Sequence, residues 1–461
     1  MRKTLVYFVF LLSCIQVFGQ SPSSNDPITA VGIGRINPTN LQTTFFAGGL
    51  NATNNGAFIH NTSNPASLGS LTKYTLFDVS VNGSFNQLSI NNSKNNYAGG
   101  SLDNLSLAMP LFNQKNEYIR PDSLRPKLGL GLNLKNFSDI GYQINTSTQV
   151  GGADDILETV VSGTGNTSVL GLDLGVRYRN HAFGLGLDYQ FSSIQDETLV
   201  LPLNSGVDSR IIESNSDFNL RVFKVKPGVI TDLDLKNIFL INRIKKDSTL
   251  NEAEKIRKIK NAQPLKLTGG AYAKIPFSAR SLQNGSIFSR NSFTAADTIR
   301  IADELEEKLD YPVTFGAGVS IARGGKWVFG IDGQYDVWSQ FKGEFRDGNF
   351  TDSYKVSVGG QYTPLALDIT NYLNRIQYRG TAYAGQYYLI VNNEQTYNYG
   401  IGFGLGLPIK LAKYTDPAFI NLGFDLGRFD TSDDYYNSDY LRINLGFTLT
   451  SDDWFIKRKI K

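Results

Sequence analysis

The sequence has very little cysteine and histidine. Its 461 residues include one cysteine, Cys14, and two histidines, His60 and His181. A zinc site needs several cysteines or histidines at close spacing, and a hydrolase triad needs a base with an orienting partner. Neither histidine has such a context, and no cluster of His, Cys, Asp and Glu has metal-ligand spacing. We therefore expect no enzyme activity, no metal and no cofactor.

Long apolar runs are also missing, apart from one at the N-terminus. Two basic residues precede a nearly continuous apolar run, Leu5 to Phe18, which is the pattern of a secretory signal peptide. We expect residues 1–19 to be this signal, with cleavage near Gly19. The run falls short of the roughly 20 apolar residues that a membrane helix needs. A lipoprotein signal with its lipid on Cys14 is the alternative.

The chain has no strong excess of charge of either sign. Its formal net charge is +3 at pH 7, which argues against nucleic acid as a partner. It contains 45 Gly, 23 Tyr and 29 Phe, and this composition favours β-structure over a helical bundle. An exported chain without a helical anchor is then either a secreted β-protein or an outer-membrane β-barrel.

Alternating segments distinguish these two classes. In Val169 to Tyr178, bulky apolar residues occupy one face, and Gly, Asp and Arg occupy the other. Similar patterns recur at 183–190, 397–407, 420–427 and 441–449. Runs of about 10 alternating residues match tilted strands that cross a bilayer, with the small polar face toward a filled or wet lumen. A soluble sandwich also alternates, but the apolar faces often end in aromatic residues, as an interfacial girdle does.

The sequence thus predicts an all-β fold, namely an antiparallel transmembrane β-barrel of about 14 strands in the cell outer membrane. The predicted strands are 72–83, 97–110, 126–138, 166–178, 182–192, 217–232, 264–276, 311–323, 326–338, 353–363, 375–389, 396–408, 418–428 and 438–450. An even number places both chain ends in the periplasm, with short turns at 179–180 and 323–325. Asp332 and Asp336 share one strand face, and we expect them to pair with lumenal Lys or Arg.

Two inserts in the barrel have helical patterns. A periplasmic insert near 235–263 contains Thr249-x-x-Glu252, the pattern of a capping box. An external loop near 295–310 reads DTIRIADELEEKL from Asp297, the expected N-cap. We interpret both as solvated helices rather than as partner contacts.

Several motifs in this layout resemble the FadL-type outer-membrane transport family. They are Ile33 to Pro38, Gly48-Gly49, Asn64 to Leu68, Asn136 to Tyr142, Asp332 to Phe341, Asn371 to Arg375, Tyr378 to Gly380, Gly402 to Pro408, and Trp454 to Lys459. Their order along nearly the whole mature chain carries the resemblance. It implies a barrel with the strand number counted above and an N-terminal plug that closes the lumen.

The resemblance identifies the irregular polar segment 20–71 as the plug and 72–461 as the barrel. The residues that match the family's plug are Gly48, Gly49, Asn64, Pro65 and Ala66. Irregular backbone is tolerated at membrane depth when protein encloses it. The Asn, Ser and Thr side chains of the segment can hydrogen-bond to a polar wall.

The same resemblance implies a channel or transporter for hydrophobic small molecules such as long-chain fatty acids, embedded in outer-membrane lipid. Three apolar residues of the plug, Phe45, Phe46 and Phe58, are the ligand-binding candidates, and the competing interpretation is that they wedge the plug against the wall. A transporter of this type requires an apolar pocket and a lateral gap near Asn136 to Gly141. The Gly, Asp and Asn lumen faces argue against a continuous apolar passage.

The alternative function is that of a FadL-like barrel acting as an accessory subunit of an outer-membrane protein secretion or barrel-assembly complex. Its partners would then be other outer-membrane proteins. The sequence leaves this alternative open, because the same barrel pattern serves both functions.

Overall fold

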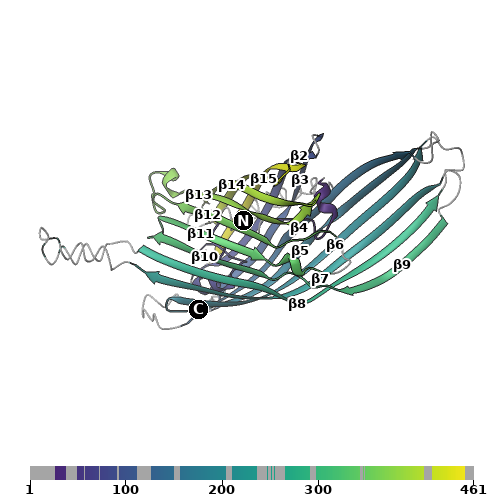
Figure 1. The fold of residues 1–461 in the computed structure, drawn as a ribbon. Coiled ribbons are helices and arrows are strands. Elements are labelled where there is room, and N and C mark those ends of the chain that lie inside the picture. The colour runs from purple at the N-terminus through teal and green to yellow at the C-terminus, as the bar shows by residue number, and fades with distance from the viewer. Residues whose placement is uncertain are drawn as a thin grey trace, which may run out of the picture.

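The computed structural model describes residues 26–37, 49–56, 58–71, 73–90, 93–111, 126–149, 156–203, 210–235, 247, 251, 254, 265–290, 297–342, 346, 348–409, 418–433 and 435–451. Their strands form one 16-stranded antiparallel sheet (Figure 1). The sheet closes into a barrel because the last strand, β16, pairs with β2. Strands β1 and β9 lie outside this ring, which leaves the 14 strands that the sequence predicts.

The ring strands are β2 (Thr75–Ile90), β3 (Ser93–Pro110), β4 (Lys127–Gln149), β5 (Ile156–Tyr178), β6 (His181–Leu203), β7 (Ile211–Asp234), β8 (Leu265–Arg290), β10 (Thr314–Arg323), β11 (Trp327–Asp336), β12 (Ser353–Tyr362), β13 (Gln377–Val391), β14 (Glu394–Ile409), β15 (Ala418–Thr431) and β16 (Tyr436–Ser451). The remaining elements are η2 (Pro27–Ala30), β1 (Arg35–Ile36), η3 (Pro65–Ser70), β9 (Asp297–Lys308), η5 (Trp338–Gln340) and η6 (Tyr372–Arg375).

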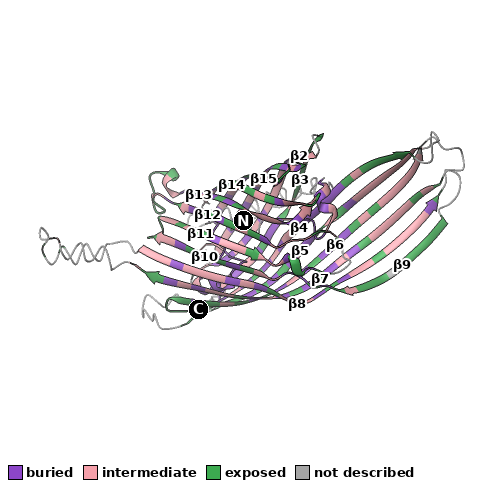
Figure 2. Cartoon of the chain, in the orientation of Figure 1, coloured by how far each residue is buried: buried purple, intermediate pink, exposed green. Residues whose placement is uncertain are grey.

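The alternation of side chains explains why these segments form a barrel in lipid. On β5, Leu170, Leu172 and Leu174 point outward and are 42–49% exposed, whereas Asp173 is fully buried in the lumen. Figure 2 shows the same alternation of buried and exposed residues along the neighbouring strands. A closed ring pairs the backbone amides that lipid could not satisfy. The predicted 14-stranded β-barrel is therefore confirmed.

The short periplasmic turns lie where the sequence predicts them. Arg179, in the β5–β6 turn, has φ 53°, and Gly324 and Gly325, in the β10–β11 turn, have φ 53° and 68°. Turns of two or three residues between antiparallel strands require such left-handed backbone. Both ends of the ring, Thr75 and Ser451, lie on the same side as these turns, the side that the sequence predicts to be periplasmic.

The barrel is much taller on one side than the other. Strands β4 to β8 are 23 to 26 residues long, whereas β10, β11 and β12 have 10 residues each. In Figure 1 the long strands run out together beyond the ring as one curved sheet. The ranges 139–165, 193–216 and 277–310 lie between the predicted strands, where the sequence predicts external connections. Much of each range is strand in the structure. In this part of the sheet apolar residues do not keep to one alternating face, as in Val160-Val161 and Leu199-Val200-Leu201, so no hydrophobic alternation reveals it.

The predicted external helix near 295–310 is wrong. Residues Asp297–Lys308 form β9, which pairs with the outer half of β8. An ion pair between Arg280 and Glu306, 2.7 Å apart, joins the two strands. Pairing with a long neighbour overrides the helical preference of the Glu, Lys and Leu residues here, because strand formation depends strongly on cross-strand context.

The periplasmic insert near 235–263 is mostly outside the described residues, but part of its capping motif is visible. Asn251 N–H donates to Glu254 Oε2 (3.2 Å), and Glu254 N–H donates to Asn251 Oδ1 (2.8 Å). This reciprocal pair is a capping box, two residues later than the predicted Thr249 and Glu252. The predicted signal peptide, residues 1–19, lies outside the described residues. No helix in the part of the chain that the structure describes is long and apolar enough to span a membrane.

The lumen is filled rather than open. In its outer half, buried rings from the β11–β12 connection pack on the wall, with the Trp338 and Tyr388 ring centroids 4.3 Å apart. The N-terminal segment contributes Ile28 and Ile33 to the same core. Arg346 joins these parts, because its guanidinium donates to Thr29 O (2.9 Å) and to Asp196 of β6 (3.0 Å).

Candidate functional site: the lumen and its N-terminal segment

A buried ion cluster occupies the lumen wall on three neighbouring strands. Lys226 of β7 is fully buried, and its Nζ lies 3.0 Å from the carboxylates of both Asp173 of β5 and Asp188 of β6. The same Nζ donates to Thr62 O of the N-terminal segment (2.8 Å). A buried cation with two carboxylates and a carbonyl has its charge and its donors satisfied. The cluster therefore bonds the segment to the wall.

A glycine makes room for this cluster. Gly186 lies between Asp173 and Lys226 in the strand register. A Cβ at that position would lie 2.1 Å from Asp173 Oδ1 and 2.7 Å from Lys226 Cε. Gly186 is therefore required by close packing against the ion cluster, and not only by the presence of water in the lumen.

The Asn-Pro-Ala step of the segment is held against the wall by its asparagine. Asn64 is the N-cap of η3, and its Oδ1 accepts from Ala66 N–H (3.2 Å). Its Nδ2 donates to the carbonyls of Val229 on β7 (3.2 Å) and Ala271 on β8 (3.3 Å). Asn64, Pro65 and Ala66 are all buried. One side chain thus ends the irregular backbone, starts the short helix and bonds to two strands.

A second polar cluster fixes the start of the segment. Arg35 donates to Asn86 (2.9 Å) and Ser438 (2.9 Å), and it forms an ion pair with Asp26 (3.2 Å). Tyr436 of β16 donates its hydroxyl to Asp26 Oδ2 (2.9 Å). These bonds reach β2 and β16, the two strands that close the barrel.

The wall is open between β3 and β4 in its outer half. Strands β3 and β4 pair from Asn104–Lys135 to Pro110–Gly129. Farther out, β1 takes the place of β3 beside β4 at Ser138 and Asp139, while β5 pairs with β4 along its whole length. The pairing of β4 with β5 has a register shift at the same level, between Asn136 and Ser138. The backbone edge of β3 facing this seam has no strand partner among the described residues. The seam coincides with the lateral gap expected near Asn136 to Gly141.

The cavities inside the barrel differ in size and position. A cavity in the middle of the lumen has a volume of about 90 Å³ and is lined in part by Asp336, Lys355 and Arg442. A second cavity at the periplasmic mouth has about 680 Å³, and Arg177 and Asp232 line it. Small-molecule pockets typically measure about 300–1,000 Å³ and are mostly apolar. The lumenal cavity falls below that range, and the periplasmic one has charged walls.

Comparison with known families adds the deciding observation. The family model described as BamG matches residues 1–461. The chain belongs to the BamG family. No protein with a curated description matches the chain.

Several solved structures are similar to this BamG-family chain. The toluene transporter TodX of P. putida is 14% identical, with 86% of this chain and 94% of that chain covered and a TM-score of 0.49. The CymD monoaromatic hydrocarbon channel is 12% identical (91% and 99% covered, TM-score 0.45). A Pseudomonas aeruginosa FadL homologue is 10% identical (91% and 99% covered, TM-score 0.47). The predicted FadL-type resemblance agrees with these matches, and the BamG-family assignment agrees with the predicted outer-membrane location.

The remaining predicted site residues have mixed positions in the BamG-family barrel. Gly49 is buried at φ +79°, and its carbonyl accepts from Ser357 Oγ of β12 (3.0 Å). Gly48, Phe45 and Phe46 lie outside the described residues. The role of Gly48, Gly49, Asn64, Pro65 and Ala66 as a plug against solutes stays a prediction.

Phe58 lies at the periplasmic rim rather than in the enclosed lumenal cavity. Its ring centroid is 5.5 Å from that of Tyr74, just before β2, and 5.3 Å from that of Phe419 on β15. The side chain is half-buried. These contacts are those of a wedge between segment and wall, and a ligand-binding role for Phe58 stays a prediction.

Two acidic residues have partners other than those predicted. Asp332 accepts from the backbone N–H of Ala52 (2.6 Å), and Asp336 accepts from Thr314 Oγ1 (2.5 Å). The buried Lys355 interacts electrostatically with both carboxylates, so the expected pairing with a lumenal lysine holds in charge, whereas their hydrogen bonds go to the groups named here. Irregular backbone inside the barrel carries unsatisfied amides, and a wall carboxylate is a strong acceptor for one of them.

Lys226 and Arg346 are the functional residues that sequence reasoning missed. Lys226 follows Lys224 at a spacing of two on β7, which places both on one strand face. The same face carries the apolar Leu220 and Val222 farther out. A face that changes from apolar to charged along one strand gives no clean alternation, although two inward lysines opposite two inward aspartates could have suggested an ion cluster.

Proposed function

We propose that this outer-membrane barrel is a closed subunit of an outer-membrane protein assembly rather than a conducting pore. The observation that carries the proposal is the occupied lumen. Buried bonds from Lys226, Asn64 and Arg35 join the N-terminal segment to strands around the ring, and the lumenal cavity of about 90 Å³ holds a few water molecules at most. The assignment to the BamG family supports an accessory role in secretion or barrel assembly.

Co-purification tests this proposal. The tagged full chain is extracted from native outer membranes in mild detergent and analysed by protein and lipid mass spectrometry. We expect one or more outer-membrane proteins at fixed stoichiometry and no fatty acid retained by the barrel. A barrel that elutes alone with a stoichiometric long-chain fatty acid would refute the proposal and favour transport.

Conductance gives a second test of the occupied lumen. In planar bilayers we expect the intact chain to conduct almost no ionic current. We expect deletion of residues 51–70 to open a non-selective pore, because η3 and the backbone beside Lys226 leave the lumen. Equal conductance of the two proteins would show that the segment does not close the barrel.

The second candidate function is a channel for hydrophobic small molecules, and the β3–β4 seam is the observation that favours it. Asn136 Nδ2 donates to Ser101 Oγ across the seam (3.2 Å), so a Ser101→Cys, Asn136→Cys pair can lock it. A transporter with a lateral exit should lose uptake of a labelled fatty acid on oxidation and regain it on reduction. We expect no difference between the two states, with the single Ser101→Cys variant as control.

A further inference from the structure

The periplasmic loop between β12 and β13, residues 363–376, exposes apolar side chains to an unusual degree. Leu367 is 90% exposed and Ile369 is 93% exposed, while Leu365 and Leu373 are 56% and 61% exposed. The lipid-facing leucines of β5, by comparison, are 42–49% exposed. Side chains that project this far from a structured loop need a hydrophobic environment to cover them.

The loop is held in one shape by its own hydrogen bonds. The Asp368 carboxylate accepts from Thr370 N–H (2.8 Å), Asn371 N–H (3.1 Å) and Asn374 Nδ2 (2.6 Å). Leu365 N–H donates to Asn374 O (2.7 Å) and closes the loop. The hydrogen bonds to Asp368 hold the pKa of its carboxyl well below the usual range. Leu367 and Ile369 therefore project from a pre-ordered turn and lose little backbone entropy when they are buried.

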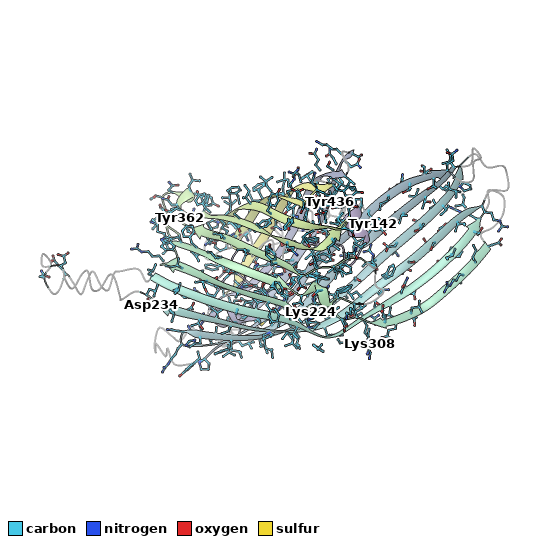
Figure 3. All side chains as sticks on the ribbon, viewed as in Figure 1. Tyr142, Lys224, Asp234, Lys308, Tyr362 and Tyr436 are labelled. Carbon is cyan, nitrogen blue, oxygen red and sulfur yellow. The ribbon has the colours of Figure 1, made fainter. Side chains whose placement is uncertain are left out.

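The loop leans over the outer, lipid-facing surface of the barrel rather than over its mouth. Tyr378 faces outward from β13, and its hydroxyl donates to Leu373 O (3.1 Å). Tyr372 crosses β13 and donates to Pro408 O of β14 (3.2 Å). Figure 3 labels Tyr362, where the loop begins, at the same end of the barrel as Asp234, which precedes the periplasmic insert. Tyr362 and Tyr378 are thus part of the aromatic girdle at the periplasmic interface.

The lipid-facing wall directly above the loop is hollowed. A groove of about 780 Å³ runs over β10 to β14, and Tyr362, Tyr378, Phe329 and Phe403 are among its lining residues. Because Tyr378 also bonds to the loop, the groove and the exposed side chains form one apolar surface. Two cations border it: Arg375 lies 4.9 Å from the Tyr372 ring, and Lys326 lies 5.9 Å from the Tyr362 ring. Cations beside a girdle suit lipid phosphates.

We propose that residues 363–376 form an interfacial anchor that inserts Leu367 and Ile369 into the periplasmic leaflet of the outer membrane, with Arg375 and Lys326 at the phosphates of phospholipids. Lipid is the expected partner of this loop because the loop contacts Tyr378, which faces outward, and so continues the lipid-facing wall. The hydrogen bonds to the Asp368 carboxylate within the loop reduce the cost of taking its charge out of water. The proposal is independent of whether the barrel is a subunit or a channel.

A fluorescent probe tests the anchor directly. Leu367→Cys, with Cys14 replaced by Ser, is labelled with NBD and reconstituted in vesicles of phosphatidylethanolamine and phosphatidylglycerol. The matched control is Ile299→Cys on β9, which is 59% exposed at the far end of the barrel. We expect doxyl-labelled lipids to quench the probe at 367 several-fold more than the probe at 299, and iodide to quench it several-fold less.

Three outcomes decide the proposal. Equal iodide quenching at the two sites would refute it, because the loop would then lie in water. Protection from iodide in native membrane fragments, but not in vesicles of the purified protein, would identify a protein partner as the occupant and would also refute it. Lipid quenching in vesicles that is lost when Ile369→Ser and Leu373→Ser are added, with an unchanged heat-modifiable gel shift, would confirm insertion.

Discussion

Removing the cation of the lumenal ion cluster should destabilise the barrel strongly. Lys226 is fully buried, and its Nζ contacts Asp173, Asp188 and Thr62 O at 3.0, 3.0 and 2.8 Å. In Lys226→Met, the side chain keeps its length but the two carboxylates lose the cation that lies between them. Breaking a buried ion pair by removing one partner costs about 3–5 kcal/mol. We expect a loss of that size in the free energy of unfolding, and a looser N-terminal segment.

Two matched variants separate the ion cluster from the general cost of losing a lysine. Lys266→Met removes a lysine that also pairs with an aspartate, Asp232, at 2.8 Å, but its side chain is 37% exposed. An exposed pair is worth about 0–1 kcal/mol. Adding Asp173→Asn and Asp188→Asn to Lys226→Met removes the unpaired charges, and we expect this triple variant to recover most of the lost stability.

Urea titration of the barrel in lipid vesicles, followed by tryptophan fluorescence and by heat-modifiable gel migration, measures these differences. Agreement between the two probes checks that unfolding is two-state. A protease-accessibility assay on the same samples reports whether residues near Thr62 are released. If Lys226→Met lost no more stability than Lys266→Met, or if the triple variant were no better than Lys226→Met, the cluster would not hold the segment as reasoned.

Three further predictions follow from contacts described above. Gly184→Ala should destabilise the barrel in urea titration, because its Cβ would lie 2.2 Å from Ala66 N, whereas Gly269→Ala, with nothing within 4 Å of its Cβ, should be neutral. Phe58→Ala should cost less than the about 3–5 kcal/mol of a fully buried phenylalanine, because the ring is half-buried; a larger loss in the same titration would contradict this. Hydrogen bonds lower the pKa of Asp368, so its carboxylate stays ionised and keeps the loop ordered at neutral and mildly acidic pH. Lipid quenching of the Leu367→Cys probe should therefore be constant from pH 7 to about pH 4 and should weaken only at lower pH. Weakening near pH 6 in a quenching titration would contradict that reasoning.

The sequence predicted the barrel well because lipid imposes a strict pattern on transmembrane strands. Where Leu170 to Leu174 alternate with glycine and aspartate, the outward and inward faces are unambiguous. Beyond the membrane, strands no longer need one apolar and one small polar face, so this alternation is lost. The sequence of Asp297–Lys308 then favours a helix, although the segment forms β9. Pairing of Asp297–Lys308 with β8 could not be read from a single segment, because it depends on a neighbour that is itself longer than a membrane strand.

The candidate site was less predictable than the fold. The Asn-Pro-Ala step is visible in the sequence, but the partners of Asn64 on β7 and β8 lie 165 and 207 residues away in the chain. The partner of Asp332 is a backbone amide, and a backbone amide leaves no trace in composition. Sequence patterns report on faces of regular strands, whereas this lumen is assembled from irregular backbone against several strands at once.

The bonds between Asp26 or Arg35 and β16 also constrain the order of assembly. They join residues separated by 410 and 403 positions in the chain. The N-terminal segment is synthesised first, yet these partners exist only after the final strand has been made. Closing loops of this length is entropically costly and slow. Asp26 and Arg35 must therefore remain without these partners throughout export. A chaperone bound during that interval would have to leave both residues free to bond when β16 pairs with β2 and closes the ring.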